Sequence, residues 1–175
     1  MPHVVELASS GRAKCRACAG RIAAQAWRFG ERLPNPYDDQ GGEMTHWFHP
    51  WCAAYRRPQA FAESADAVAV LGGEAGAMLE EARLGVAHHR LARVNTAERA
   101  ATGRATCRSC RELIPKDAWR ISLLYYEDGR FAPSGFVHAS CAAAYFETPA
   151  FVRRLRHFTP GLSDEDLSHF PAGTP

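Results

Sequence analysis

The sequence predicts an α+β fold of two small, similar units, each a short antiparallel sheet with a helix, joined by a helical segment. Three observations lead to this prediction. A spacing of cysteine and histidine residues occurs twice, the residues around it are repeated as well, and a length of 175 residues leaves fewer than 100 for each half. Because units of that size bury little apolar surface, they commonly need a metal ion or cross-links to fold.

The repeated spacing is Cys-x2-Cys followed by His-x2-Cys, with 30 intervening residues in the first copy and 27 in the second, and it uses all six cysteines. Three thiolates and one imidazole complete the tetrahedral shell of a structural Zn2+ ion. Three disulfides are the alternative, but the cysteines are sparse and the opening residues lack the basic start and apolar run of a secretory signal. The tandem spacing therefore predicts two structural zinc ions. The expected ligands are Cys15, Cys18, His49 and Cys52 in the first copy and Cys107, Cys110, His138 and Cys141 in the second.

The similarity of the two halves extends beyond the expected ligands. A repeat within one chain indicates that the same structural unit is built twice. The matched segments are SSGRAKCRAC and ATGRATCRSC around the first half-sites, HPWCAA and HASCAA around the second, and the pairs Trp27-Arg28 and Trp119-Arg120.

Local patterns place the elements of each unit. Alternating apolar residues and β-formers predict strands, and each His-x2-Cys half-site begins a helix. The expected strands are 3–7 and 26–29 in the first copy and 91–95 and 118–126 in the second, with loops at 38–42 and 127–135. The expected boundaries are 1–61 for the first finger, 62–90 for the helical connector, 91–158 for the second finger, and 159–175 for a C-terminal helix and tail.

Helices are also expected outside the two units. In the connector, Met78 and Ala82 recur at helical spacing, and the Gly-Gly pair at 72–73 should divide it into two helices. This segment would either bind a partner or, as is more common, pack on a finger. Near the C-terminus, Ser163 followed three residues later by an aspartate resembles a capping box that opens a last helix.

The charge distribution gives no whole-molecule argument for nucleic acid binding. The formal charge of +2 counts the cysteines as neutral, and six bound thiolates with two Zn2+ ions would bring it near zero. Arginine and lysine instead gather locally, between residues 12 and 32 and between residues 104 and 120, where an ordinary solvated surface is the alternative interpretation. No run of apolar residues is long enough to predict a transmembrane helix.

The second copy contains Gly-Arg-Ala-x-Cys-x2-Cys, then Ile-Pro-Lys-Asp-x2-Arg, then a segment ending in His-x2-Cys, and the first copy contains the outer parts of the same pattern. This pattern resembles the poly(ADP-ribose) polymerase-type zinc finger in both halves. Fingers of this family, which also occur in a DNA ligase that repairs nicks, recognise DNA strand breaks rather than base sequence. The resemblance implies a non-enzymatic sensor or adaptor for nicked, gapped or blunt-ended DNA.

The resemblance also implies roles for individual residues. A break exposes the flat face of a terminal base pair, on which apolar or aromatic side chains can stack, while arginines hold the flanking phosphates without reading sequence. The implied phosphate contacts are Arg12, Arg28, Arg104 and Arg120. The stacking residues are expected in the segment before the histidine: Phe131 and then Tyr126 in the second copy, and Leu33, Tyr37 and Met44 in the first, with core packing as the alternative for each aromatic.

The implied partner is double-stranded DNA with strand breaks, with repair proteins acting in trans and no membrane. A monomer is expected because the tandem already supplies two fingers, and the implied location is intracellular and DNA-associated, in a bacterial cytoplasm and nucleoid or in a nucleus. Two other function classes stay open. One is a zinc-stabilised protein-interaction module without DNA-break specificity. The other, a metal-dependent nuclease, is least favoured because four protein ligands would close each zinc site.

Overall fold

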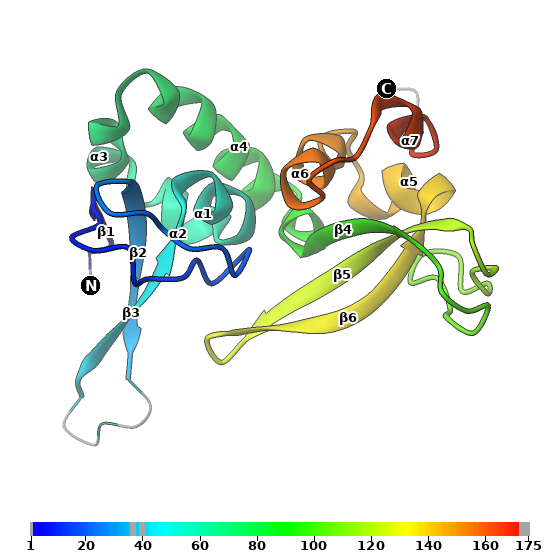
Figure 1. The fold of residues 1–175 in the computed structure, drawn as a ribbon, viewed down its shortest axis with the longest axis horizontal. Coiled ribbons are helices and arrows are strands. Elements are labelled where there is room, and N and C mark those ends of the chain that lie inside the picture. The colour runs from blue at the N-terminus through cyan, green and yellow to red at the C-terminus, as the bar shows by residue number, and fades with distance from the viewer. Residues whose placement is uncertain (1, 36–37, 39–40, 172–175) are drawn as a thin grey trace. The chain divides into compact units, whose positions relative to one another are not determined.

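The computed structural model describes residues 2–35, 38 and 41–171. The chain divides into two compact units, the first spanning Met1–Ala87 with Asp128–Arg130 and the second His88–Glu127 and Phe131–Pro175. Each contains a three-stranded sheet with helices packed on it, so the predicted α+β class is confirmed (Figure 1). No helix among the described residues is long and apolar enough to span a membrane.

The sheet of the first unit is antiparallel and has its longest strand in the middle. Its strands are β1 (Val4–Leu7), β2 (Trp27–Pro34) and β3 (Glu43–Phe48), in the order β1-β2-β3. Phe29 of β2 pairs with Val5 and with Phe48 across the two ladders. Its ring also packs on Phe61, with centroids 5.2 Å apart, and all three phenylalanines are fully buried. This aromatic core fixes the sheet against the helices that follow it.

The helices of the first unit follow the sheet in sequence. They are α1 (Pro50–Arg56), α2 (Pro58–Ala62), α3 (Ala65–Val68), the 3-10 helix η1 (Ala69–Glu74) and α4 (Ala75–Ala87). Gly72, with φ of 66°, interrupts the helical backbone as the Gly-Gly pair predicts. Helix α4 packs on α1 and α2 and buries Met78 and Ala82. The connector is therefore helical, and its apolar face is used within the first unit.

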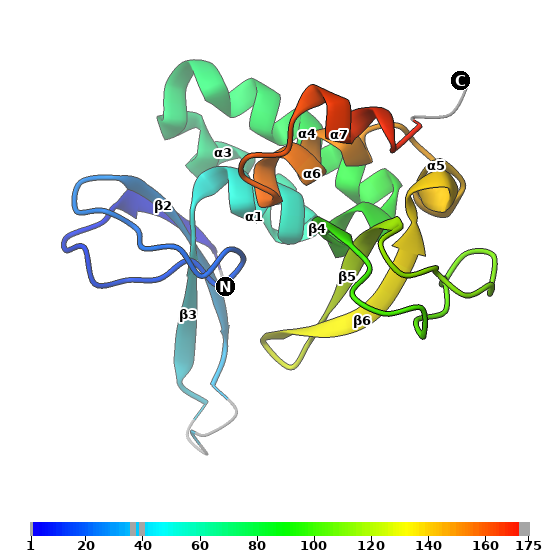
Figure 2. The ribbon, with the colours of Figure 1, turned by 45° about the vertical axis from the view of Figure 1, so that its right-hand side comes forward.

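The second unit repeats the sheet and follows it with its own helices. Its elements are the 3-10 helix η2 (His89–Arg93), β4 (Val94–Arg99), β5 (Trp119–Glu127), β6 (Arg130–His138), the 3-10 helix η3 (Ala139–Cys141), α5 (Ala142–Phe146), α6 (Phe151–Phe158) and α7 (Asp164–Ser168). The strand order is β4-β5-β6. Helices α5, α6 and α7 lie on one side of this sheet (Figures 1 and 2).

The last helix has the cap that the sequence predicts. The Ser163 hydroxyl accepts a hydrogen bond from the backbone N–H of Asp166, and the Asp166 carboxylate accepts one from the backbone N–H of Ser163. This reciprocal pair is a capping box in which aspartate replaces the usual glutamate or glutamine. Helix α7 thus has a defined start, and the tail at 172–175 lies outside the described residues.

Two expectations about local structure were wrong. The strand expected at 91–95 begins at Val94 and runs to Arg99, because Leu91 belongs to the 3-10 helix η2. The loop expected at 127–135 is mostly strand β6, which begins at Arg130. The strand contains Pro133 and Gly135, and it lies at the edge of the sheet, where a proline is tolerated when its nitrogen faces away from the partner strand.

Candidate metal centres and nucleic-acid interface

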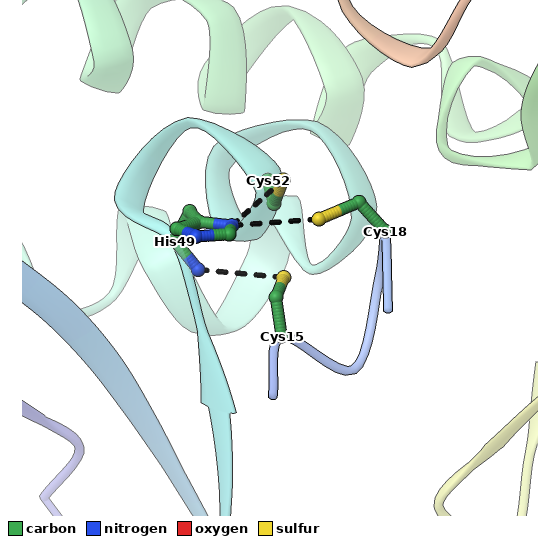
Figure 3. Close-up of side chains that lie close together, drawn as sticks. All are labelled: Cys15, Cys18, His49 and Cys52. Atoms are coloured by element: carbon green, nitrogen blue, oxygen red, sulfur yellow. Dashed lines mark hydrogen bonds between the residues drawn. The ribbon is translucent and has the colours of Figure 1, made fainter. Parts of the chain in front are cut away.

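The first metal centre joins a turn after β1 to the junction of β3 and α1. Cys15 and Cys18 lie on the turn, which an antiparallel bridge between Lys14 and Arg21 closes. His49 and Cys52 come from the start of α1 (Figure 3). The Nδ1 atom of His49 lies 3.4 Å from the Sγ of Cys18 and 3.9 Å from that of Cys52. The four side chains converge on one point although 31 residues separate Cys18 from His49.

The second metal centre reproduces the first. Cys107 and Cys110 lie on the turn between β4 and β5, and His138 and Cys141 lie where β6 meets η3. The Nδ1 atom of His138 is 3.4 Å from the Sγ of Cys110 and 3.9 Å from that of Cys141, the same two distances as in the first centre. Two centres with the same geometry are therefore built by the repeated segments.

The donor sets fit zinc. In each centre the four ligand atoms lie within 4.8 Å of one another, and all six cysteines are free thiols rather than disulfides. A tetrahedral ion with Zn–S of about 2.3 Å and Zn–N of about 2.0 Å would place sulfur and nitrogen about 3.5 Å apart, and the observed 3.4 and 3.9 Å bracket that value. The two Cys3His clusters are thus positioned to bind two zinc ions. Four protein ligands leave no open position for a reacting group, which is typical of a structural site.

Outer contacts orient the ligands in the same way in both centres. The Nε2 atoms of His49 and His138 lie 3.2 Å from the backbone oxygens of Arg21 and Leu113, so each Nε2–H can donate while Nδ1 faces the metal position. The backbone N–H groups of the same histidines donate to the sulfurs of Cys15 and Cys107 at 3.4 Å. Such donors favour the thiolate, which is the form that binds metal.

The thiol pKa values follow from these contacts. The side-chain hydrogen bond with Cys52 holds the pKa of Cys15 far below its ordinary value, at about 4. Burial opposes ionisation of Cys107, but backbone N–H groups, first that of His138, lower the pKa of this thiol to about 7. Each centre therefore has one cysteine near its core that the protein favours as a thiolate.

The four arginines expected at phosphates fall into two structural classes. Arg12 and Arg104 are exposed on the segments that precede the first cysteine of each centre. Arg28 and Arg120 are instead held in the sheets. Their guanidinium groups donate through Nε and Nη2 to Glu6 and Glu98, at 2.5–3.2 Å in the first unit and at 2.5 and 2.9 Å in the second. The phosphate role of all four stays a prediction.

The sequence analysis missed the groups that hold these two arginines. Each guanidinium also lies 3.5 Å above the centroid of an aromatic ring, Trp47 for Arg28 and Phe136 for Arg120. Such stacking adds to the ion pair. The sequence repeat contains a signal for both kinds of contact. Glu6 and Glu98 are 92 positions apart, as Cys15 and Cys107 are, and the two aromatic residues are 89 positions apart, as the two histidine ligands are.

The expected stacking residues lie on the two β-hairpins. In the second unit, Tyr126 of β5 and Phe131 of β6 are half-buried and pack on each other, with ring centroids 4.7 Å apart. In the first unit, Leu33 and Met44 are opposite one another in the β2–β3 ladder and are also half-buried. Tyr37 lies outside the described residues. Each hairpin thus carries an apolar pair close to where its two strands are joined.

A further basic site borders the second metal centre. Arg108 and Arg111 line a shallow pocket with Cys107, Gly135 and Phe136. Both arginines are exposed, and Arg108 also donates through Nε to the backbone oxygen of Ser134 at 3.0 Å. These two cations extend the basic surface that begins at the exposed Arg104.

The chain is similar in sequence to a known protein. The chain is 31% identical to poly(ADP-ribose) polymerase 1 of Gallus gallus over 136 residues, which cover 69% of this chain and 13% of that protein. The chain thus spans a small part of the length of the relative it matches. No family model matches the sequence. The similarity and the two Cys3His clusters are compatible with zinc fingers of the poly(ADP-ribose) polymerase type.

Proposed function

We propose that this chain is a non-enzymatic zinc-finger protein that binds DNA strand breaks and serves as a damage sensor or repair adaptor. One observation carries the proposal: the same arrangement occurs twice, with a Cys3His centre at the base of a β-hairpin that bears an apolar pair. Similarity to a poly(ADP-ribose) polymerase supports it.

The metal centres would make each hairpin a rigid probe. The histidine ligand directly follows β3 in the first unit and is the last residue of β6 in the second. The cysteine turn is hydrogen-bonded to the same strand, through the backbone N–H of Arg16 in the first unit and of Arg108 in the second. A bound zinc ion would fix the turn, the hairpin and the first helix together. Rigid presentation lowers the entropy that is lost when the hairpin meets DNA.

The hairpin side chains would cover the exposed base pair. A nick or an end leaves one base face without its neighbour, and stacking an aromatic ring there contributes about 1–3 kcal/mol per base. Tyr126 and Phe131 offer two rings that are already packed on each other. In the first unit, Leu33 and Met44 offer aliphatic surface instead. Intact duplex exposes no such face, so this contact would select breaks.

Phosphate contacts would fix the position of each finger. Arg12 and Arg104 are exposed and project from the segment beside the metal centre. Arg28 and Arg120 each donate one Nε–H and one Nη2–H to a glutamate, so a phosphate would meet the N–H groups that remain on Nη1 and Nη2 of these largely buried side chains. With the metallated chain near neutrality, these local contacts would supply the attraction to DNA.

We further propose that the protein acts as a monomer, is associated with DNA inside the cell, and recruits repair enzymes in trans. Two fingers on one chain raise the effective concentration of the second finger once the first has bound. A protein-interaction module without DNA-break specificity is the competing function, favoured by the near-neutral metallated charge.

Competition binding tests the proposal. Fluorescence anisotropy would follow zinc-loaded protein on a labelled nicked hairpin, with unlabelled nicked and intact hairpins of equal length as competitors, at two salt concentrations. We expect the nicked competitor to be more effective at both. Equal competition that weakens steeply with salt would show backbone attraction alone, and an absence of binding would favour the interaction module.

A further inference from the structure

The two units differ at one face of their sheets, although the residues there are matched by the repeat. Leu7 pairs directly with Trp27 across β1 and β2, and Arg99 pairs with Trp119 across β4 and β5. Both pairs are related by the same 92 positions that relate the first cysteines of the two metal centres. The two faces are therefore equivalent sites in two copies of one unit, and differences between them are informative.

In the second unit the chain covers this face with its own C-terminal segment. The ring of Phe170 lies edge-on to Trp119 with centroids 5.6 Å apart, and His169 follows at 6.1 Å. Phe170 and Leu167 are buried. Leu167 lies on helix α7, which begins at the Ser163 capping box, and Phe170 follows the helix in a turn, where its backbone N–H donates to the backbone oxygen of Leu167 at 2.9 Å. A helical turn with leucine and phenylalanine three positions apart is thus the natural cover of this face.

In the first unit the same face is open. Leu7 is 43% exposed and Trp27 is 40% exposed, and both are among the most exposed large apolar side chains of the described residues. Helix α4, the last helix of the first unit, packs on α1 and α2 rather than on this face. The face therefore keeps its apolar surface without the cover that its copy has.

The chemistry of the first face is also more apolar than that of the second. Leu7 replaces Arg99, whose guanidinium lies 4.3 Å from the Trp119 ring. At the start of the first helix, Pro50 and Trp51 replace Ala139 and Ser140, which line the pocket beside Trp119. These replacements remove a cation and a hydroxyl and add a leucine and an indole. Such a surface suits an apolar protein segment better than a phosphate backbone.

We propose that the Leu7–Trp27 face is the docking site for a partner protein, which inserts a helical turn with leucine and phenylalanine three positions apart. The turn takes the place of the segment that ends α7 in the second unit, where Phe170 lies against Trp119. Its phenylalanine lies against Trp27, and its apolar side chains cover Leu7 where the second unit has Arg99. An aromatic residue centred in such a patch is the kind of contact that dominates binding energy at protein interfaces.

A peptide with the sequence of residues 159–171 is a direct probe, because it carries this turn. It would be titrated into full-length, zinc-loaded, 15N-labelled protein, with the Trp27 indole resonance assigned through Trp27→Phe. We expect a saturable shift of the Trp27 indole. A peptide with alanine at the positions of Leu167 and Phe170 should produce none. Shifts at Trp119 alone, or no shift at Trp27, would overturn the proposal.

A matched variant controls for folding. The double substitution Leu7→Arg with Trp51→Ser gives the first unit residues that the second unit already tolerates at the same positions. We expect it to keep two zinc ions and unchanged binding to nicked DNA, while the peptide binds about tenfold or more weakly. Unchanged peptide affinity in this variant would contradict the proposal. So would a shift of the Trp27 indole by nicked DNA that the peptide cannot reverse, because the face would then belong to the DNA surface.

Discussion

Replacing Phe131 with alanine should weaken binding to nicked DNA while leaving the fold in place. Phe131 is half-buried on the β5–β6 hairpin, and its ring packs on that of Tyr126 with 4.7 Å between the centroids. It belongs to no part of either metal centre. The substitution therefore removes the surface that we propose to stack on an exposed base while keeping both zinc sites.

The size of the effect follows from stacking energies. Loss of one base contact costs about 1–3 kcal/mol, which raises the dissociation constant about 5- to 150-fold. Because Phe131 is a neutral residue, its loss should leave the dependence of log affinity on log salt unchanged. The variant thus separates stacking from phosphate attraction.

The assay is anisotropy binding to nicked and intact hairpins across a salt series. The matched control is Tyr125→Ala, since Tyr125 is a 44% exposed neighbour on β5 whose side chain alternates to the opposite face of the sheet. We expect the preference for the nick to fall for Phe131→Ala and to persist for Tyr125→Ala. Equal losses in the two variants, or an unchanged preference in the first, would refute the stacking role.

Three further predictions concern the metal, a sheet ion pair and a phosphate contact. Cys110→Ser should lower the zinc content measured by atomic emission from two ions per chain to one and unfold the second unit. The reason is that the binding energy of a structural zinc, about 10–16 kcal/mol, is comparable to the stability of a domain. Retention of two ions would show that Cys110 is not a ligand. Glu98→Ala should lower the free energy of unfolding in urea by about 1–2 kcal/mol, because Arg120 loses two hydrogen bonds to a carboxylate that is itself 37% exposed. An unchanged unfolding midpoint would contradict this prediction. Arg104→Ala should reduce the salt slope of DNA binding by about 0.9, whereas the exposed Arg83→Ala should not, and equal slopes in the two variants would remove Arg104 from the phosphate contacts.

The metal centres could be predicted in full from the sequence. Zinc requires particular residue types in close pairs, so the Cys-x2-Cys and His-x2-Cys half-sites name their own ligands. The clusters formed by Cys15 and by Cys107 with their partners confirm the prediction of two zinc-capable sites. The α+β class followed from the same repeat, because each half had to supply its own sheet and helix.

Other features depend on contacts that no local pattern encodes. The ion pairs of Arg28 and Arg120 join residues 22 positions apart, and glutamate and arginine are ordinary surface residues when read singly. Strand β6 was missed because its proline and glycine indicate a loop unless the strand is known to lie at an edge. The equivalence of the two halves is the signal that could have found the ion pairs, since it relates Glu6 to Glu98. It could not have found β6, because its counterpart β3 (Glu43–Phe48) was not expected from the sequence either.

The position of the protein on DNA tests the central claim most directly. Hydroxyl-radical footprinting of zinc-loaded protein would use a duplex with one nick at a known position, beside the same duplex after ligation. We predict protection centred on the nick that disappears from the ligated duplex and is lost when zinc is chelated. Protection that is uniform along both duplexes, or that survives chelation, would contradict recognition of strand breaks by zinc-stabilised fingers.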